Sequence, residues 1–206
     1  MANTYDENIR EALIKLLLDE LRQSHEVTGH PARIISELGI SHGAFRIDIV
    51  TVNSCVHGYE IKSDADTLVR LPEQAKAYSQ VFDKLTLVVG EKHIINAMSI
   101  IPDWWGVKLA KIHTDSSTIL LSDIRTALDN KSQDILSVAH LLWRQEALDI
   151  LESNNAANGV KSKRREFIYE RLVSAIDFID IQKAVREKLF TRQDLRADRQ
   201  LLQYGD

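Results

Sequence analysis

The chain has 206 residues, 44% of them hydrophobic, and a formal net charge of -4, which is enough apolar material for a core but gives no overall attraction to nucleic acid. Binding to nucleic acid would therefore need a local basic patch. The lone cysteine, Cys55, excludes an internal disulfide and any zinc site built from several cysteines.

A helix, a strand and a hairpin are predicted in the N-terminal part. Five apolar residues at helical spacing predict a helix from residue 3 or 4 to about residue 24; they are Ile9, Leu13, Leu16, Leu17 and Leu21. Residues 32–38 are expected to form a strand. Residues 44–52 and 56–62 alternate apolar and polar side chains, and Asn53-Ser54 between them favours a turn, so these segments are predicted to form an antiparallel hairpin.

Helices and strands alternate in the next segment. Leu71-Pro72 opens a helix that runs to about residue 82, because proline is tolerated in the first helical turn. A continuous apolar strand over residues 85–89, a helix over 91–100 and a strand over 105–110 follow. This order predicts an α/β fold in which helices flank a central sheet and the strand at 85–89 is buried on both faces.

The sequence changes character beyond about residue 115. Four short helices are predicted there, over residues 119–127, 135–152, 165–179 and 181–190. Thr114-Asp115-Ser116-Ser117 is interpreted as a connector. We therefore predict an α/β domain at residues 1–113 and a helical C-terminal subdomain at residues 114–206.

The hairpin places two carboxylates and an amine at related positions. If the turn is centred on Ser54, Asp48 lies opposite Glu60, and directly opposed side chains share a face with Cβ atoms roughly 5 Å apart. Lys62 returns to that face by the strand period of two, while Ile47, Ile49, Tyr59 and Ile61 take the other face. On an ordinary sheet these charges would simply face solvent, but the surrounding helices and the buried strand favour a functional site.

Such a group has the chemistry of a divalent metal site. Mg²⁺ or Mn²⁺ prefers oxygen ligands and is commonly held by one or two carboxylates, so Asp48, Glu60 and the carbonyl oxygen of Ile61 are the predicted ligands. Lys62 beside the metal would orient an attacking water and stabilise a phosphate. Arg46 shares the strand parity of Asp48 and is expected either to border the site and bind substrate or to form a surface ion pair.

Asp48, a gap of eleven residues and Glu60-Ile61-Lys62 resemble the signature of the PD-(D/E)XK nuclease superfamily. Gln74 and Tyr78, one turn apart on a predicted helix, resemble the Gln-X-X-X-Tyr motif of its RecB-like branch. The stretch at residues 58–64 and Pro102-Asp103-Trp104-Trp105-Gly106 resemble the bacterial sce7726 family, and the likeness covers nearly the whole chain. The superfamily's proline before the aspartate is absent, because Ile47 stands there.

This resemblance implies a restriction-endonuclease-like α-β-β-β-α-β core. It also implies a Mg²⁺-dependent deoxyribonuclease, a phosphodiester hydrolase acting on DNA in repair or in phage or mobile-element DNA processing. Asp48, Glu60 and Lys62 would be catalytic, together with a further acidic residue in the first helix, Glu11, for which Glu37 on the preceding strand competes.

The resemblance also implies a supporting role for the pair on the second helix. Gln74 and Tyr78 would contact the substrate phosphate or support the site. On an ordinary helix they would instead be a surface residue and a half-buried aromatic residue.

A basic loop, Lys161-Ser162-Lys163-Arg164-Arg165, separates two predicted helices. Helix, basic loop and helix resemble a SAP-type DNA-binding hairpin. Lys161, Lys163, Arg164 and Arg165 are therefore predicted to contact phosphates with a salt-sensitive affinity that does not depend on base sequence. A solvated loop is the alternative interpretation.

Two other functions stay open. The first is a catalytically silent accessory protein that binds nucleic acid and has a nuclease-like fold, and the second is a protein-interaction module. DNA is the expected partner, and the sequence does not decide between a homodimer and a helicase or repair partner. No apolar run approaches the ~20 residues of a membrane span, and the N-terminus is acidic, so we expect a cytoplasmic protein without membrane contact.

Overall fold

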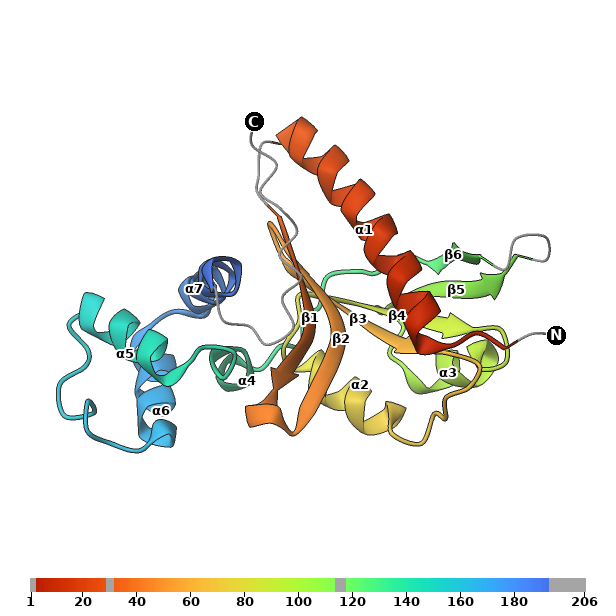
Figure 1. The fold of residues 1–206 in the computed structure, drawn as a ribbon. Helices are drawn as coiled ribbons and strands as arrows, with labels where there is room; N and C mark the ends of the chain where they lie inside the picture. Colours follow the sequence, from red (N-terminus) through yellow and green to blue (C-terminus); the bar gives the residue numbers. More distant parts are fainter. Residues whose placement is uncertain (1–2, 29–31, 114–117, 193–206) are drawn as a thin grey trace.

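The structure is a computed structural model that describes residues 3–28, 32–113 and 118–192. A six-stranded sheet forms its centre, and helices lie on both faces (Figure 1). In chain order the elements are α1 (Asp6–Thr28), β1 (Arg33–Ile40), the short 3-10 helix η1 (Ser41–Gly43), β2 (Phe45–Val52), β3 (Val56–Lys62), α2 (Leu71–Ser79), β4 (Lys84–Gly90), α3 (Ile94–Ile100), β5 (Gly106–Ile112), β6 (Ile119–Arg125), α4 (Ile135–Ala139), α5 (Arg144–Ser153), α6 (Arg165–Ala175) and α7 (Phe178–Thr191).

The strands follow one another across the sheet in the order β1 to β6. β1, β2 and β3 are antiparallel, β3, β4 and β5 are parallel, and β6 is antiparallel to β5. The predicted α/β class, with its α-β-β-β-α-β core, mixed sheet and C-terminal helices, is confirmed. β4 is buried along nearly its whole length, as a central parallel strand must be when helices cover both faces.

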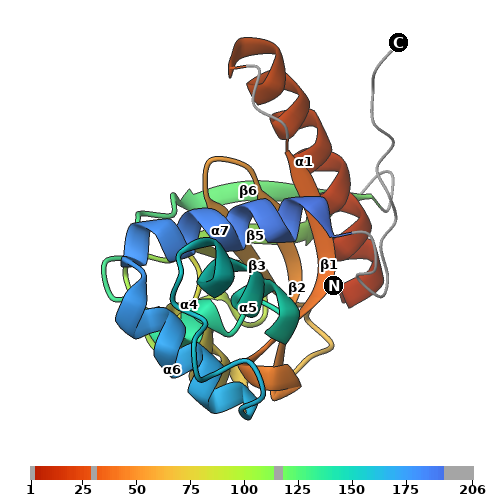
Figure 2. The same cartoon turned by 90° about the vertical axis from the view of Figure 1, so that its left-hand side faces the viewer.

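Two apolar clusters lie on opposite faces of the sheet. α1 contributes Ile9, Leu13 and Leu17 to one of them, against Ile49 and Val88 of the strands. The other cluster is larger and joins the sheet to α2, α3 and the C-terminal helices. α4 to α7 pack against one another beside the β1–β2 end of the sheet (Figures 1 and 2).

The prediction of a helix at residues 119–127 was wrong, because this segment is β6. A short apolar run fits a strand and a helix equally well by periodicity, and here the neighbouring β5 supplies the pairing, from Ile112 with Ile119 to Val107 with Arg125. β6 therefore joins the sheet from beyond the predicted boundary at residue 113. The connector proposed at residues 114–117 lies outside the described residues, and the division into two domains stays a prediction.

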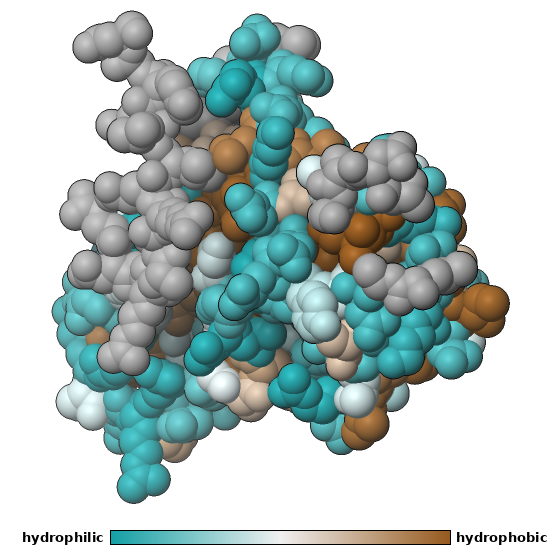
Figure 3. Space-filling view, turned by 45° about the vertical axis from the view of Figure 1, so that its right-hand side comes forward, coloured by the Kyte–Doolittle hydropathy of each residue, from teal (hydrophilic) through white to brown (hydrophobic). Residues whose placement is uncertain are grey.

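The helix predicted over residues 135–152 is divided into α4 and α5. Within the described part of the chain, no helix is both long and apolar enough to cross a bilayer. In the view of Figure 3, hydrophilic side chains cover much of the described surface, and hydrophobic side chains show in smaller areas between them.

Gly90, at the end of β4, lies against a buried hydrogen-bonded carboxylate. Asp64 accepts hydrogen bonds from the N–H and hydroxyl of Thr4 at 3.0 and 2.8 Å and from the N–H of Lys92 at 2.9 Å, which ties the start of the chain to the ends of β3 and β4. A methyl group at Gly90 would lie 2.4 Å from Asp64 Oδ1 and 2.9 Å from its backbone nitrogen.

Gly90→Ala is therefore expected to lower the free energy of unfolding by about 1–3 kcal/mol, because backbone as well as side chain must shift. Urea denaturation would measure the change. Gly39→Ala is the matched control, since its added methyl meets only one atom at 3.8 Å. Equal stability of the two variants would refute the expectation.

Candidate functional site

The predicted register of the β2–β3 hairpin is confirmed. Val52 pairs with Val56 and Ile49 with Tyr59, as a turn centred on Ser54 requires. Beyond Ile49 the regular pairing stops. There the carboxylate of Asp48, through Oδ2, accepts the backbone N–H of Ile61 at 2.7 Å.

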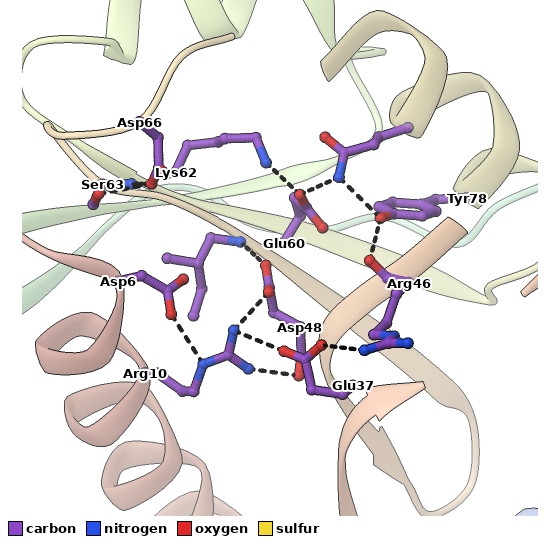
Figure 4. A network of polar contacts seen from close by, with 12 residues as sticks. Asp6, Arg10, Glu37, Arg46, Asp48, Glu60, Lys62, Ser63, Asp66 and Tyr78 are labelled. Carbon is purple, nitrogen blue, oxygen red and sulfur yellow. Dashed lines mark hydrogen bonds and ion pairs between the residues drawn. The ribbon is translucent and has the colours of Figure 1, made fainter. Parts of the chain in front are cut away.

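The irregularity changes which way the two carboxylates point. Ile47 packs in the cluster on the α2 face, whereas Ile49 packs in the cluster on the α1 face, so the strict alternation of β2 fails between them. Asp48 contacts Arg10 of α1 (Figure 4), while Glu60 accepts a hydrogen bond from Gln74 of α2. The prediction that Asp48 and Glu60 share one face was therefore wrong.

The guanidinium of Arg10 lies among three carboxylates (Figure 4). It is 2.7 Å from Asp48 Oδ1, 3.0 Å from Glu37 Oε1 and 3.2 Å from Asp6 Oδ1, and it also donates to the carbonyl of Asp48 at 3.0 Å. Burial raises the pKa of Asp48 although the Ile61 N–H and Arg10 both oppose the shift. The chain itself thus supplies a cation that these three carboxylates share.

Glu37, the third carboxylate that contacts Arg10 beside Asp48 and Asp6, has an unusual backbone conformation. Its φ of 58° lies in the left-handed region, which a residue with a side chain rarely adopts within a strand. Such strain persists only where surrounding contacts hold it, and here the carboxylate faces Arg10 and lies 3.7 Å from Arg46. Of the two candidates for the further acidic position, Glu37 contacts Arg10, whereas Glu11 is exposed on α1 and makes no described contact with the group.

Glu60 is almost fully buried on the α2 side. Its Oε1 atom accepts hydrogen bonds from Lys62 Nζ and, at 2.6 Å, from Gln74 Nε2, whereas its buried Oε2 has no partner among the described residues. Burial, reinforced by the charge of Asp48, raises the pKa of Glu60 to about 7 against the opposing effect of Lys62. Tyr78 is also buried and donates to the carbonyl of Arg46 at 2.7 Å.

The raised pKa of Glu60 predicts a pH-dependent stability. The folded state holds this proton between the unfolded pKa near 4.5 and the folded pKa near 7, so the free energy of unfolding contributed by Glu60 falls as pH rises through this window. The expected loss is about 2–3 kcal/mol.

Comparison of the native chain with the double variant Glu60→Gln/Lys62→Met, by urea denaturation at pH 5 and pH 8, measures this loss. The double variant leaves no unpaired charge at the site. The native chain should lose stability relative to the variant between the two pH values, and a constant difference would contradict the assignment.

A divalent cation at this place would compete with contacts that the carboxylates already make. Both side-chain oxygens of Asp48 accept hydrogen bonds. Among residues 3–28, 32–113 and 118–192, no group of three or more His, Cys, Asp or Glu residues could hold a metal ion. As arranged, these residues do not fit Mg²⁺ or Mn²⁺, and the predicted ligation by Asp48, Glu60 and Ile61 stays a prediction that calorimetric metal titration would test.

Sequence reasoning missed Arg10. Its position one turn after Asp6 suggests only a surface ion pair within a helix, and nothing local in the sequence indicates that β1 and β2 bring two more carboxylates to it. Gln74 and Tyr78, predicted to bind substrate or support the site, are both buried. Gln74 donates a hydrogen bond to Glu60, and Tyr78 donates one to the backbone of β2. The supporting role is the one their contacts fit.

The predicted basic loop lies apart from this group, between α5 and α6. Arg144 donates to the carbonyls of Lys161 and Lys163 at 2.8 and 3.3 Å and so fixes the loop on α5. Lys161 pairs with Glu152 at 2.7 Å, which neutralises one of the four predicted phosphate-binding residues. Arg165 begins α6 and contacts His42 of η1 at 3.2 Å.

The family described as bacteriophage P4 protein cII matches residues 4–203. Protein cII of Enterobacteria phage P4 is 34% identical over 86 residues, which cover 42% of this chain and 32% of that relative. This match therefore spans about a third of the relative's length. No solved structure matches the chain significantly.

These matches overturn the resemblance to the sce7726 family and to the PD-(D/E)XK nucleases, and with it the predicted DNA-hydrolysing activity. The nuclease resemblance rests on short motifs, Asp48 with Glu60-Ile61-Lys62 and the pair Gln74 and Tyr78, and on a helix and strand order that many α/β proteins share. A match over nearly the whole chain outweighs it. The ion pairs of Arg10 with Asp48 and of Lys62 with Glu60 agree with the correction, because each carboxylate has a cationic partner within the chain, Glu60 through Oε1 alone.

Proposed function

Because this chain belongs to the bacteriophage P4 cII family, we propose that it is a non-catalytic accessory protein that binds DNA through its helical C-terminal part. The observation that carries the proposal is an exposed basic surface whose cations form no ion pair with a carboxylate of the described residues. We define the basic surface as Lys163, Arg164, Arg165 and Arg171 with the aromatic ring of Phe167. All five side chains are exposed, in a molecule whose net charge is negative.

The basic surface combines charge with an aromatic platform. A groove of about 370 Å³ is lined by two cations, Lys163 and Arg171, by one carboxylate, Glu170, and by Phe167, which is 53% exposed. Among the described residues no carboxylate lies within ion-pair distance of its four cations, whereas Lys161 next to them is paired. Proteins bind single-stranded nucleic acid with basic side chains along its phosphate backbone and with exposed aromatic rings on which the bases stack.

The experiment that tests the proposal is DNA binding by the full chain, measured by fluorescence anisotropy with a labelled single-stranded 20-mer and the matching duplex. About three phosphate contacts should give a slope near -2 to -3 in a plot of log K against log salt concentration. Binding should persist in EDTA, because no contact of the basic surface requires a metal. Absence of salt-dependent binding at low ionic strength would refute the proposal.

A protein-interaction module is the second candidate, and β6 favours it. β6 is an edge strand of the sheet, and Leu120 and Ile124 on it are 49% and 48% exposed. An edge strand with apolar side chains can pair with another chain. Light scattering after size exclusion, with the native chain and Leu120→Lys, would test this role. The homodimer, the helicase or repair partner and the cytoplasmic location stay predictions.

A further inference from the structure

A second cavity lies where the C-terminal helices meet the turn between β1 and β2. Its volume is about 280 Å³, and the side chains that give it chemical character are His42, His140, Trp143, Arg165, Tyr169 and Arg192. No aspartate or glutamate lines it. Four rings and the guanidinium of Arg165, in a lining without a carboxylate, favour a ligand that is both anionic and aromatic; the second guanidinium, that of Arg192, is already paired with Glu146.

The rings form a continuous cluster. The ring centroids of His42 and His140 are 4.4 Å apart, and those of His140 and Tyr169 are 4.8 Å apart. The hydroxyl of Tyr169 donates to the carbonyl of Leu142 at 2.6 Å and fixes that ring. Burial, and then the neighbouring His42, lower the pKa of His140, which favours an uncharged ring there.

The cations have different roles. Arg192 is buried, bonded to Glu146 at 2.9 Å and placed 4.5 Å from the centroid of Trp143, so it holds that ring rather than a ligand. Among the described residues Arg165 has no carboxylate partner, and its guanidinium is hydrogen-bonded to Nδ1 of His42 at 3.2 Å. Since a guanidinium donates only, this contact can be exchanged for a stronger one to an anion.

The start of α6 adds to the positive potential at Arg165. α6 has 11 residues, and no side chain caps its N-terminus at Arg164. The first backbone N–H groups of a helix have no partner within the helix and carry a partial positive charge. Arg165 is the first residue of α6 and lines the cavity, so this end of the helix lies next to the cavity; Glu166, the acidic residue of the first turn, does not line it.

We propose that this cavity binds one unpaired nucleotide of a DNA strand, with its phosphate at Arg165 and the start of α6 and its base against the rings of His42, His140 and Tyr169. The inference rests on the proposed DNA binding. Arg165 belongs both to the cavity and to the basic surface, so a strand that crosses the basic surface reaches the cavity without leaving the protein. Single-stranded DNA should accordingly bind more tightly than a blunt duplex of equal length.

Titration of the full chain with dAMP, deoxyadenosine and inorganic phosphate, followed by NMR of the histidine rings, tests the proposal. dAMP should shift the signals of His42 and His140 and bind more tightly than either of the other two compounds. Arg165→Gln should weaken dAMP binding about tenfold, the loss expected for a hydrogen bond to a charged group. Arg70→Gln, an exposed arginine at the start of α2 and outside the cavity, is the matched control and should bind dAMP as the native chain does.

A second variant distinguishes loss of the base contact from loss of the folded structure, because the binding of two ligands to the same variant is compared. His140→Gln removes one ring and keeps a polar side chain, and it should weaken binding of dAMP more than binding of inorganic phosphate. Equal binding of dAMP and phosphate, or no shift at His42 and His140, overturns the nucleotide site. If DNA still binds in a salt-dependent way in that case, only the cavity assignment fails; if no DNA binds, the proposed function fails as well.

Discussion

Replacing Arg10 with leucine is expected to lower the free energy of unfolding by about 3 kcal/mol at pH 7. The variant leaves the carboxylates of Asp48, Glu37 and Asp6 close together without their shared cation. Removal of one partner from a largely buried ion pair is costly because the remaining charge is left unpaired. Arg10 and Asp48 are 22% and 18% exposed, so solvent screens this pair only in part.

Urea denaturation at several pH values would measure the effect of Arg10→Leu. The deficit should shrink as the pH falls toward 4, because protonation removes the repulsion among the three carboxylates. Arg70→Leu, at an exposed position without a described partner, controls for the loss of a guanidinium and should change stability by less than about 0.5 kcal/mol. A deficit that does not depend on pH would show that Arg10 stabilises by packing and not by charge.

Reversing the charges at Lys163 and Arg164 is expected to weaken DNA binding about a hundredfold or more at 0.1 M salt. Each lost phosphate contact lowers affinity for every sequence alike and reduces the salt slope by about 1, and the introduced carboxylates add repulsion. Both side chains are exposed in the loop before α6, so the fold should tolerate Lys163→Glu/Arg164→Glu.

The matched control for this variant is Arg70→Glu/Lys76→Glu, just before α2 and on it, which changes the net charge by the same amount at two exposed positions. Anisotropy titrations of both variants at three salt concentrations distinguish a local contact from a general charge effect. If both variants weaken binding equally, the basic surface is not where DNA binds.

Much of the fold could be predicted because its signals are local. The alternation of residues 44–52 and 56–62 and the turn at Asn53-Ser54 are contained in one short segment, and the register that they predict is the one observed. β6 could not be assigned in this way, since Ile119–Arg125 becomes a strand through pairing with β5. The local pattern identifies an apolar segment, but for a short segment the element that it packs against or pairs with decides between helix and strand.

The charged residues around Asp48 and Glu60 could be predicted only in part, for a different reason. Asp48, Glu60 and Lys62 lie near the end of the hairpin, as the register implied. The face to which Asp48 points, however, depends on a break in the alternation of β2 that the sequence pattern does not indicate. Arg10 and Glu37 reach the group from α1 and β1, and no spacing rule connects elements so far apart in the chain. The cavity at His42 and His140 could not be predicted from the sequence either, because these histidines are 98 positions apart (140 minus 42).

The order of the strands bears on how the chain acquires its structure. Every strand pairs with its neighbours in the chain, from β1 to β6, so each strand finds its partner as soon as the next one has been synthesised. The attachment of α7 depends on contacts between distant parts of the chain: Arg33 of β1 donates to the carbonyls of Leu189 and Phe190, 156 and 157 positions away. Contacts of such sequence separation form late. The sheet can therefore assemble progressively from its N-terminal edge, and the docking of α7 against β1 is the step that waits for the end of synthesis.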